Sequence, residues 1–177
     1  MRTLVVYESM YGNTHTIADS IGVGLRSEGE VTVLPVHEAT AELVAWADLV
    51  IVGGPTHVHG MTRPTSRHGA AESAAKPGST VTLEPDAQGI GVRDWLAALA
   101  HVTGTPAAAF DTRLSGPALF TGRASSGIAT ELRHHGFVLV VEPESFFVDR
   151  ENRLVADEDQ RATRWGERVA AGLKVPA

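Results

Sequence analysis

Hydroxyl, amide and glycine residues gather in the segment SMYGNT at residues 9–14, directly after the β-rich run at residues 3–7. Beyond this segment, Ile17, Ile21 and Leu25 recur at helical spacing and predict a helix. The first amides of a helix have no intrahelical partner, and the helix dipole favours an anion there. The pattern therefore predicts a phosphate-binding turn. The alternative is a helix start with no ligand.

Each residue type in this turn has a physical use. The backbone amides of residues 10–14 and the hydroxyls of Ser9 and Thr14 can donate to a phosphate without any Lys or Arg. Gly12 accepts positive φ and lets the backbone approach a ligand closely, and Asn13 tolerates a left-handed turn. We expect the phosphate group to be held by these donors.

Composition limits the class of protein. The 177 residues include no Cys, are 43% hydrophobic and carry a formal charge of −6. These values predict one globular domain spanning residues 1–177, with no disulfide and no thiol chemistry. The negative charge argues against nucleic acid as a partner. No apolar run reaches the ~18 residues that a membrane span needs, and the N-terminal run is too short for a signal peptide, so we expect a cytoplasmic location.

Strand and helix patterns alternate along the chain. Apolar, β-rich runs predict strands at residues 3–7, 31–36, 48–54, 106–111 and 137–141, the last interrupted by Pro143 and resumed at 146–148. Helices are predicted after the cap residue Thr40, at residues 91–100 with Trp95 in the core, and after a cap at Ser125 or Ser126. A final helix is expected to follow a capping box of Asp157 with Gln160. This order predicts a parallel sheet covered by helices on both faces.

Ligands of such sheets bind beyond the carboxyl ends of the strands. The expected ligand loops are residues 9–14, 55–64 and 112–125, which follow the first, third and fourth strands and are rich in Gly, Pro, Ser, Thr and His.

Three segments carry a resemblance to a known family: LVVYESMYGNTHTIA at residues 4–18, GGPTHVHGM at 53–61 and AFDTR at 109–113. The chain resembles the flavodoxin-like proteins, which bind flavin mononucleotide (FMN). The resemblance implies a three-layer α/β/α sandwich with a five-stranded parallel sheet of order 2-1-3-4-5. Tyr11 departs from typical flavodoxins, which carry a hydroxyl residue of the Ser or Thr kind at that position; flavodoxin-like quinone reductases tolerate Tyr.

The same resemblance implies FMN as the cofactor and assigns its contacts. The implied phosphate ligands are Ser9, Met10, Tyr11, Gly12, Asn13 and Thr14. The implied contacts of the flavin ring are Pro55, Thr56, His57, His59 and Gly60, with Thr112 from the third segment. A glycine at the position of Gly60 is expected to flip its peptide toward the reduced ring. No catalytic residue and no metal ligand is assigned.

Aromatic side chains to stack on the ring are scarce. Typical flavodoxins place Trp and Tyr there, whereas the third loop offers only Phe120, and Tyr11 can cover one edge. His57 and His59 have three interpretations: a metal pair that lacks an evident third ligand, packing beside the flavin with one ring in solvent, or a proton donor to a reduced quinone.

The interval between residues 57 and 90 is longer than a usual βα connection. Residues 65–76 predict a helix with a Glu72–Lys76 pair, and residues 77–91 predict a loop that covers the flavin or builds a partner surface. Arg63, Arg67 and His68 form a predicted basic patch, either solvated or in contact with an anionic ligand.

Two classes of function remain open. The first is a redox module: an electron carrier for redox partner proteins, or an NAD(P)H:quinone-type reductase acting on nicotinamide and quinone molecules. The second is a flavodoxin-like domain that has lost FMN and serves regulation or interaction. A deazaflavin in place of FMN is a further alternative.

Overall fold

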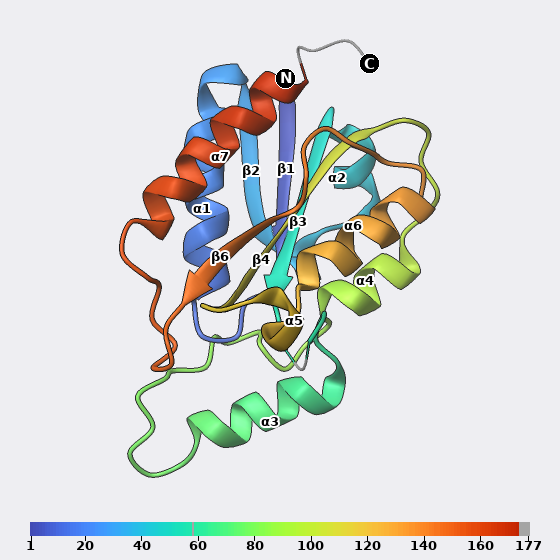
Figure 1. Ribbon diagram of the computed structural model, residues 1–177. Coiled ribbons are helices and arrows are strands. Elements are labelled where there is room, and N and C mark those ends of the chain that lie inside the picture. Colours follow the sequence, from blue (N-terminus) through green and yellow to red (C-terminus); the bar gives the residue numbers. More distant parts are fainter. Residues whose placement is uncertain (58, 174–177) are drawn as a thin grey trace.

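Parallel strands form the centre of the molecule in a computed structural model that describes residues 1–57 and 59–173 (Figure 1). The sheet has the order β2-β1-β3-β4-β5, with β6 also paired to β4, and every pairing is parallel. The predicted order 2-1-3-4-5 is therefore confirmed. The strands are β1 (Arg2–Tyr7), β2 (Glu30–Pro35), β3 (Leu49–Pro55), β4 (Pro106–Leu114), β5 (Val138–Leu139) and β6 (Glu144–Val148).

The fifth position of the sheet is shared by two short strands. β5 pairs with Pro106 and Ala107 of β4, and β6 pairs with the part of β4 from Phe110 to Leu114. Residues 140–143, which include the predicted break at Pro143, separate them, and the predicted strand at 137–141 is reduced to Val138–Leu139. β6 extends this edge toward the carboxyl end of the sheet.

Helices cover both faces of the sheet, as Figure 1 shows. α1 (Asn13–Leu25) and α7 (Glu158–Gly172) lie on one face, and α2 (Ala41–Trp46), α4 (Val92–Ala98) and α6 (Ala124–His134) on the other. α3 (Pro64–Ala74) lies beyond the carboxyl ends of the strands, and α5 (Ala118–Thr121) lies beside them. Two short 3₁₀ helices, η1 (Arg26–Glu28) and η2 (Val36–Glu38), flank β2.

Alternate residues of the central strands feed two separate cores. Val6 and Val52 pack with the α2, α4 and α6 face, whereas Val5 and Ile51 pack with α1 and α7. On the second face, Phe110, Phe146 and Trp165 are buried and meet edge to face with centroids 6.1–6.2 Å apart. Burial on both faces explains the nearly continuous apolar runs of the sequence.

Of the three predicted helix caps, one is correct and two are wrong. Thr40 caps α2 as predicted, accepting the Leu43 amide at 3.4 Å. The predicted cap at Ser125 or Ser126 is wrong, because α6 begins at Ala124 and residues from other elements accept its first amides. Asp157 does occupy the N-cap of α7, but with φ of 64° and no side-chain cap bond, so the capping box is also wrong.

The long interval before α4 contains α3, close to the predicted helix at 65–76. Glu72 lies 3.4 Å from His68 rather than pairing with Lys76. Arg67 is buried, so the predicted basic patch loses its central member. Trp95 is buried as predicted and donates to the Ala39 carbonyl. None of the described helices combines the length and apolar character needed to cross a membrane.

Candidate cofactor site

A cavity of about 420 Å³ opens at the carboxyl ends of the strands, at the edge that the sheet topology predicts for a ligand. Ten of the twelve predicted cofactor residues line it: Ser9, Met10, Tyr11, Asn13, Thr14, Pro55, Thr56, His57, His59 and Thr112. Gly12 lies in the same loop without lining the cavity, and Gly60 lines a neighbouring cavity instead. The fold thus brings together three segments that are far apart in sequence.

The first loop forms a turn that leads directly into α1. Gly12 takes the left-handed conformation (φ 90°), while Asn13 is already helical, so only the glycine uses the conformational freedom expected of both. The Thr16 amide makes the first bond, to the Gly12 carbonyl at 3.0 Å. In the described part of the chain, the amides of Asn13, Thr14 and His15 have no partner. These free donors sit at the positive end of the helix dipole, a suitable place for an anion.

Side chains of the first loop reach the other segments of the site. Ser9 accepts the Gly12 amide at 3.1 Å, which leaves its hydroxyl hydrogen free to donate. The hydroxyls of Thr14 and Thr112 lie 2.7 Å apart in a buried contact. Because only one hydrogen lies between them, the pair retains one hydrogen for another acceptor. Asn13 donates to the Asn152 carbonyl at 2.8 Å.

In the second loop, the hydroxyl of Thr56, a predicted cofactor contact, already forms hydrogen bonds within the protein. Thr56 donates its hydroxyl to Asp111 at 3.1 Å and accepts the Ala124 amide at 2.8 Å, so this side chain fixes the start of α6. Asp111 accepts the Ser125 amide as well, at 2.8 Å. The Thr56 side chain is therefore committed to the fold, although the residue still lines the cavity.

A tight turn carries the two histidines. His57 and Gly60 exchange two backbone bonds of 2.9 and 3.1 Å, and His59 has φ of 70°. His59 forms a bridge to Gly122, which has φ of 77° and lies so close that a Cβ there would approach the His59 backbone at 2.2 Å. Gly122 thus lets the connection between α5 and α6 pack against the turn.

Comparisons with known proteins agree with this architecture. Residues 4–67 match the family model described as a flavodoxin domain. The flavodoxin of Aquifex aeolicus is 46% identical over 59 residues, which are 32% of this chain and 32% of that protein, so the match spans about a third of the curated relative. Over residues 4–67 the chain is similar to a flavodoxin domain.

Solved structures extend the likeness over the whole fold. A flavodoxin from the domain Archaea superposes with a TM-score of 0.65 at 21% identity, covering 99% of this chain and 100% of that one. Oxidised flavodoxin 1 from Bacillus cereus gives a TM-score of 0.65 at 21% identity and covers 100% of both chains. Flavodoxin 2 from the same organism gives 0.66 at 21%, covering 97% of this chain and 99% of that one. The flavodoxin-like fold class is thereby confirmed.

Four residues that line the cavity lie outside the three predicted ligand loops: Val148, Asp149, Arg150 and Asn152. Arg113, Leu114 and Thr121 lie within the predicted loop at residues 112–125. Arg113 and Leu114 were expected in a loop, but β4 runs on to Leu114 because β6 supplies it with a pairing partner. The turn at residues 149–152 follows β6 at the same edge of the sheet. The predicted strand at 146–148 was the signal that could have located it.

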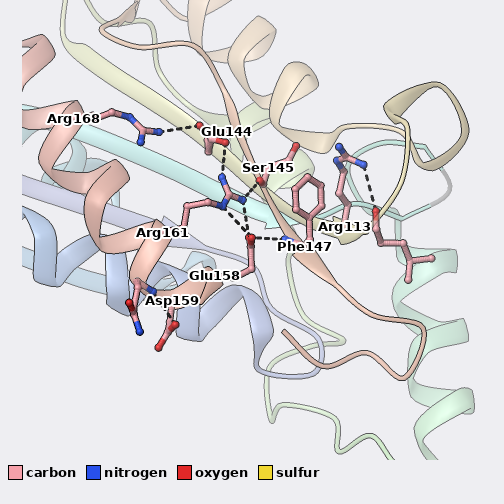
Figure 2. Close-up of polar contacts among 10 residues, drawn as sticks. Arg113, Glu144, Ser145, Phe147, Glu158, Asp159, Arg161 and Arg168 are labelled. Carbon is pink, nitrogen blue, oxygen red and sulfur yellow. Dashed lines mark hydrogen bonds and ion pairs between the residues drawn. The ribbon is translucent and has the colours of Figure 1, made fainter. Parts of the chain in front are cut away.

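An ion network fixes β6, and with it this turn, against α7 (Figure 2). Arg161 binds Glu144 at 2.7 Å and Glu158 at 2.6 Å, and it also donates to the Ser145 carbonyl. Arg168 reaches the other oxygen of Glu144 at 3.2 Å. The buried Glu158 accepts the Phe147 amide at 2.8 Å. These bonds join α7 to three residues of β6.

Arg113 connects this network to the cavity. Its guanidinium lies 4.7 Å from the centroid of the Phe147 ring, which Arg161 approaches at 5.5 Å. One Arg113 nitrogen donates to the Gly116 carbonyl and the Thr121 hydroxyl, each at 2.7 Å. Desolvation lowers the pKa of Arg113, while the charge of Asp111 opposes that shift.

Two buried donors of the cavity residues lack partners. Arg113 Nε and Asn152 Nδ2 are both shielded from solvent, and neither has a hydrogen-bond partner among the described residues. Because both residues line the cavity, these donors are available to a ligand that brings acceptors. The donor set fits a ligand rich in oxygen, such as a phosphate ester with a ribityl chain and a ring bearing carbonyls.

Aromatic cover over the cavity is thin, as the sequence indicated. Tyr11 is half-buried and its hydroxyl donates to the Ala70 carbonyl at 2.9 Å. Phe120 lines the cavity but is 73% exposed. Burial lowers the pKa of His57, which keeps its imidazole neutral at neutral pH. No cluster of three metal-ligating side chains occurs among the described residues.

The predicted loop at residues 77–91 packs behind the first loop. The Glu84 amide donates to the Met10 carbonyl at 2.8 Å, and the Glu84 carboxylate lies 2.9 Å from His15 Nδ1. The residues of this loop, all of them described, stay outside the cavity wall. The segment thus supports the first loop from outside.

Proposed function

We propose that this chain is an FMN-binding electron carrier and that its 177 residues act as one domain. The observation that carries the proposal is the set of unpartnered amides of Asn13, Thr14 and His15 at the start of α1, beside a cavity of about 420 Å³. Main-chain amides at a helix start suit a phosphate that is neutralised without cations. The family match over residues 4–67 supports this interpretation.

The predicted ligand residues divide the cofactor between two regions. Residues 9–14 and Thr112 would hold the phosphate through amides and the Thr14–Thr112 hydroxyl pair. Pro55, His57 and His59 would line the ring, and the unpartnered Asn152 amide and Arg113 Nε would meet its polar groups or the ribityl hydroxyls. When bound, FMN supplies electron transfer in one- or two-electron steps.

The chain's own contribution is to hold the ring and set its surroundings. Among the described residues, Arg113 and Arg150 line the cavity, and the one carboxylate there, Asp149, is engaged by the Arg153 amide and guanidinium. A lining of this charge does not repel the negative charge that reduction adds. We therefore expect a reduction potential that is less negative than an acidic lining would give.

The histidines of the turn have a restricted role in this proposal. His57 is neutral at neutral pH, so it can donate one hydrogen bond and accept another but holds no extra proton to deliver. The chain therefore orients the ring with His57 and carries electrons without a side-chain acid. A quinone reductase would need a proton source at this turn, and His59 is the residue left for it.

The decisive experiment is to identify the ligand that the protein carries. Freshly purified protein is expected to be yellow, with absorption at about 450 nm, and to release FMN into denaturant for mass spectrometry. The stripped protein should then quench the fluorescence of added FMN at a 1:1 ratio. A colourless protein that leaves FMN fluorescence unchanged contradicts the proposal and favours a domain that has lost its cofactor.

Further measurements separate the finer alternatives. Release of a deazaflavin would replace FMN as the cofactor. Reduction of a loaded sample by NAD(P)H, followed by turnover with a quinone, would assign a reductase. Reduction only by a partner protein or by dithionite would assign a carrier.

A further inference from the structure

A second cavity, of about 480 Å³, is lined in part by His57, His59 and Gly60. His57 and His59 line both this cavity and the cofactor cavity, so these two residues form a shared wall. The rest of the second cavity is built by Met61, Arg63, the first turn of α3 and Arg93 of α4. Its size lies in the range of small-molecule sites.

The charge of this cavity is opposite to that of the molecule. The chain carries a formal charge of −6, yet none of the described carboxylates lines the second cavity. Arg63 and Arg93 contribute two permanent cations. A concave surface that carries arginines and no carboxylate attracts small anions.

Arg93 is held in position for such a ligand. Its Nε donates to the Thr62 carbonyl and its Nη2 to the Met61 carbonyl, both at 3.0 Å. These bonds leave the two hydrogens of Nη1 free. The neighbouring Asp94 does not neutralise it, because Arg67 binds that carboxylate at 2.7 Å. Neither Arg93 nor Arg63 forms an ion pair with any described residue.

We propose that the second cavity binds a small phosphate-bearing molecule, with its phosphate between Arg63 and Arg93. A guanidinium fixed by two carbonyls matches a phosphate oxygen without losing much side-chain freedom. The ligand would contact the face of His57 and His59 that lies opposite the cofactor cavity. The site goes beyond the proposed electron transfer, since none of its charged residues is used to hold FMN.

The test is calorimetric titration with three probes: inorganic phosphate, adenosine 5′-monophosphate and adenosine. It uses the Gly12→Glu variant, whose first loop is expected to reject phosphate, so that the second cavity alone is measured. We expect the monophosphate to bind, free phosphate to bind more weakly, and adenosine not to bind. Binding of phosphate alone would identify a free-anion site of the same chemistry. Absence of binding by both anions, or equal binding of adenosine, would overturn the proposal.

Variants locate the binding. Arg93→Gln is expected to weaken the monophosphate at least about tenfold, as the loss of a charged hydrogen bond predicts, and Arg63→Gln about threefold or more. Arg133→Gln removes an exposed arginine of α6 that lines neither cavity and should leave the affinity unchanged. Equal weakening by Arg133→Gln would show a nonspecific charge effect and reject the site.

Folding and cofactor binding are controlled separately. Thermal melts check that each variant is folded. If Arg93→Gln does not fold, the Arg63→Gln variant still tests the site, because Arg63 is exposed. Wild-type protein loaded with one equivalent of FMN is expected to bind adenosine 5′-monophosphate with the same affinity as the Gly12→Glu variant. Loss of that binding in the loaded protein would place the anion in the first cavity and overturn the proposal. A chain that never binds FMN would refute the electron carrier while leaving this titration valid.

Discussion

Thr14 and Thr112 share a buried hydrogen bond in which two hydroxyl oxygens lie 2.7 Å apart across 98 positions of sequence. Thr14 is in the first turn of α1, and Thr112 lies near the carboxyl end of β4. The contact therefore ties the predicted phosphate loop to the next wall of the cavity.

This pair gives a prediction for stability. Thr14→Val or Thr112→Val alone leaves one buried hydroxyl without its partner and should lower the free energy of unfolding by about 1–3 kcal/mol. The double variant should cost about 1 kcal/mol less than the sum of the single changes. Urea unfolding measures both. Thr130→Val, at an exposed helical position, should stay within about 0.5 kcal/mol. Strict additivity of the two buried changes would argue against the hydrogen bond.

A substitution at Gly12 tests whether cofactor binding depends on the first loop. Gly12→Glu brings a side chain and a negative charge to a residue with φ of 90° beside the free amides of α1, and it should abolish FMN binding. Fluorescence titration measures the affinity. Gly78→Glu is the matched control, because Gly78 also has positive φ (81°) and a Cβ added there would meet no described atom within 4 Å. Unchanged FMN affinity in Gly12→Glu would exclude this loop as the phosphate site.

A substitution at Gly122 tests whether the position of His59 matters for FMN binding. In Gly122→Ala the new Cβ would meet the His59 backbone at 2.2 Å, so that backbone must move. We expect a loss of about 1–3 kcal/mol in stability, together with weaker FMN binding. Gly69→Ala, in the middle of α3 with open space around it, should instead stabilise the protein by about 0.5–1 kcal/mol. Full retention of FMN affinity in Gly122→Ala would remove the turn from the ring site.

His57 predicts a pH dependence. Burial lowers its pKa in the folded protein below the ordinary 6.5, so the unfolded chain binds a proton more readily. The free energy of unfolding therefore decreases as the pH falls through 6.5 toward the folded pKa, and this part of the stability is present above 6.5. His57→Gln should flatten that decrease, measured by urea unfolding at several pH values. The exposed His68→Gln serves as a control, and an identical pH profile for wild type and His57→Gln would refute the effect.

Local patterns were enough to predict most of the sheet and one of its loops. The apolar runs identified β1, β3 and β4 because strands buried on both faces need apolar residues at every position. The turn at Gly12 was also predicted, since a hydroxyl- and glycine-rich segment between a strand and a helix has few other uses.

Contacts between distant segments decided the rest. α6 starts at Ala124 because Thr56 and Asp111 accept its first amides, which no local capping rule could reveal. Arg67, which was predicted to lie in a surface patch, is buried and paired with Asp94. Arg93, for which the sequence predicted no role, lines the second cavity.

The sequence by itself determined the periodicity of the strands and helices, the order of the segments and the turn that opens α1. Only the tertiary structure decided which polar groups are paired and where β4 ends. It also placed the turn at residues 149–152 in the wall of the cavity. The physical reason is that periodicity depends on neighbours a few residues apart, whereas a hydrogen bond or ion pair depends on atoms that only the folded chain brings together.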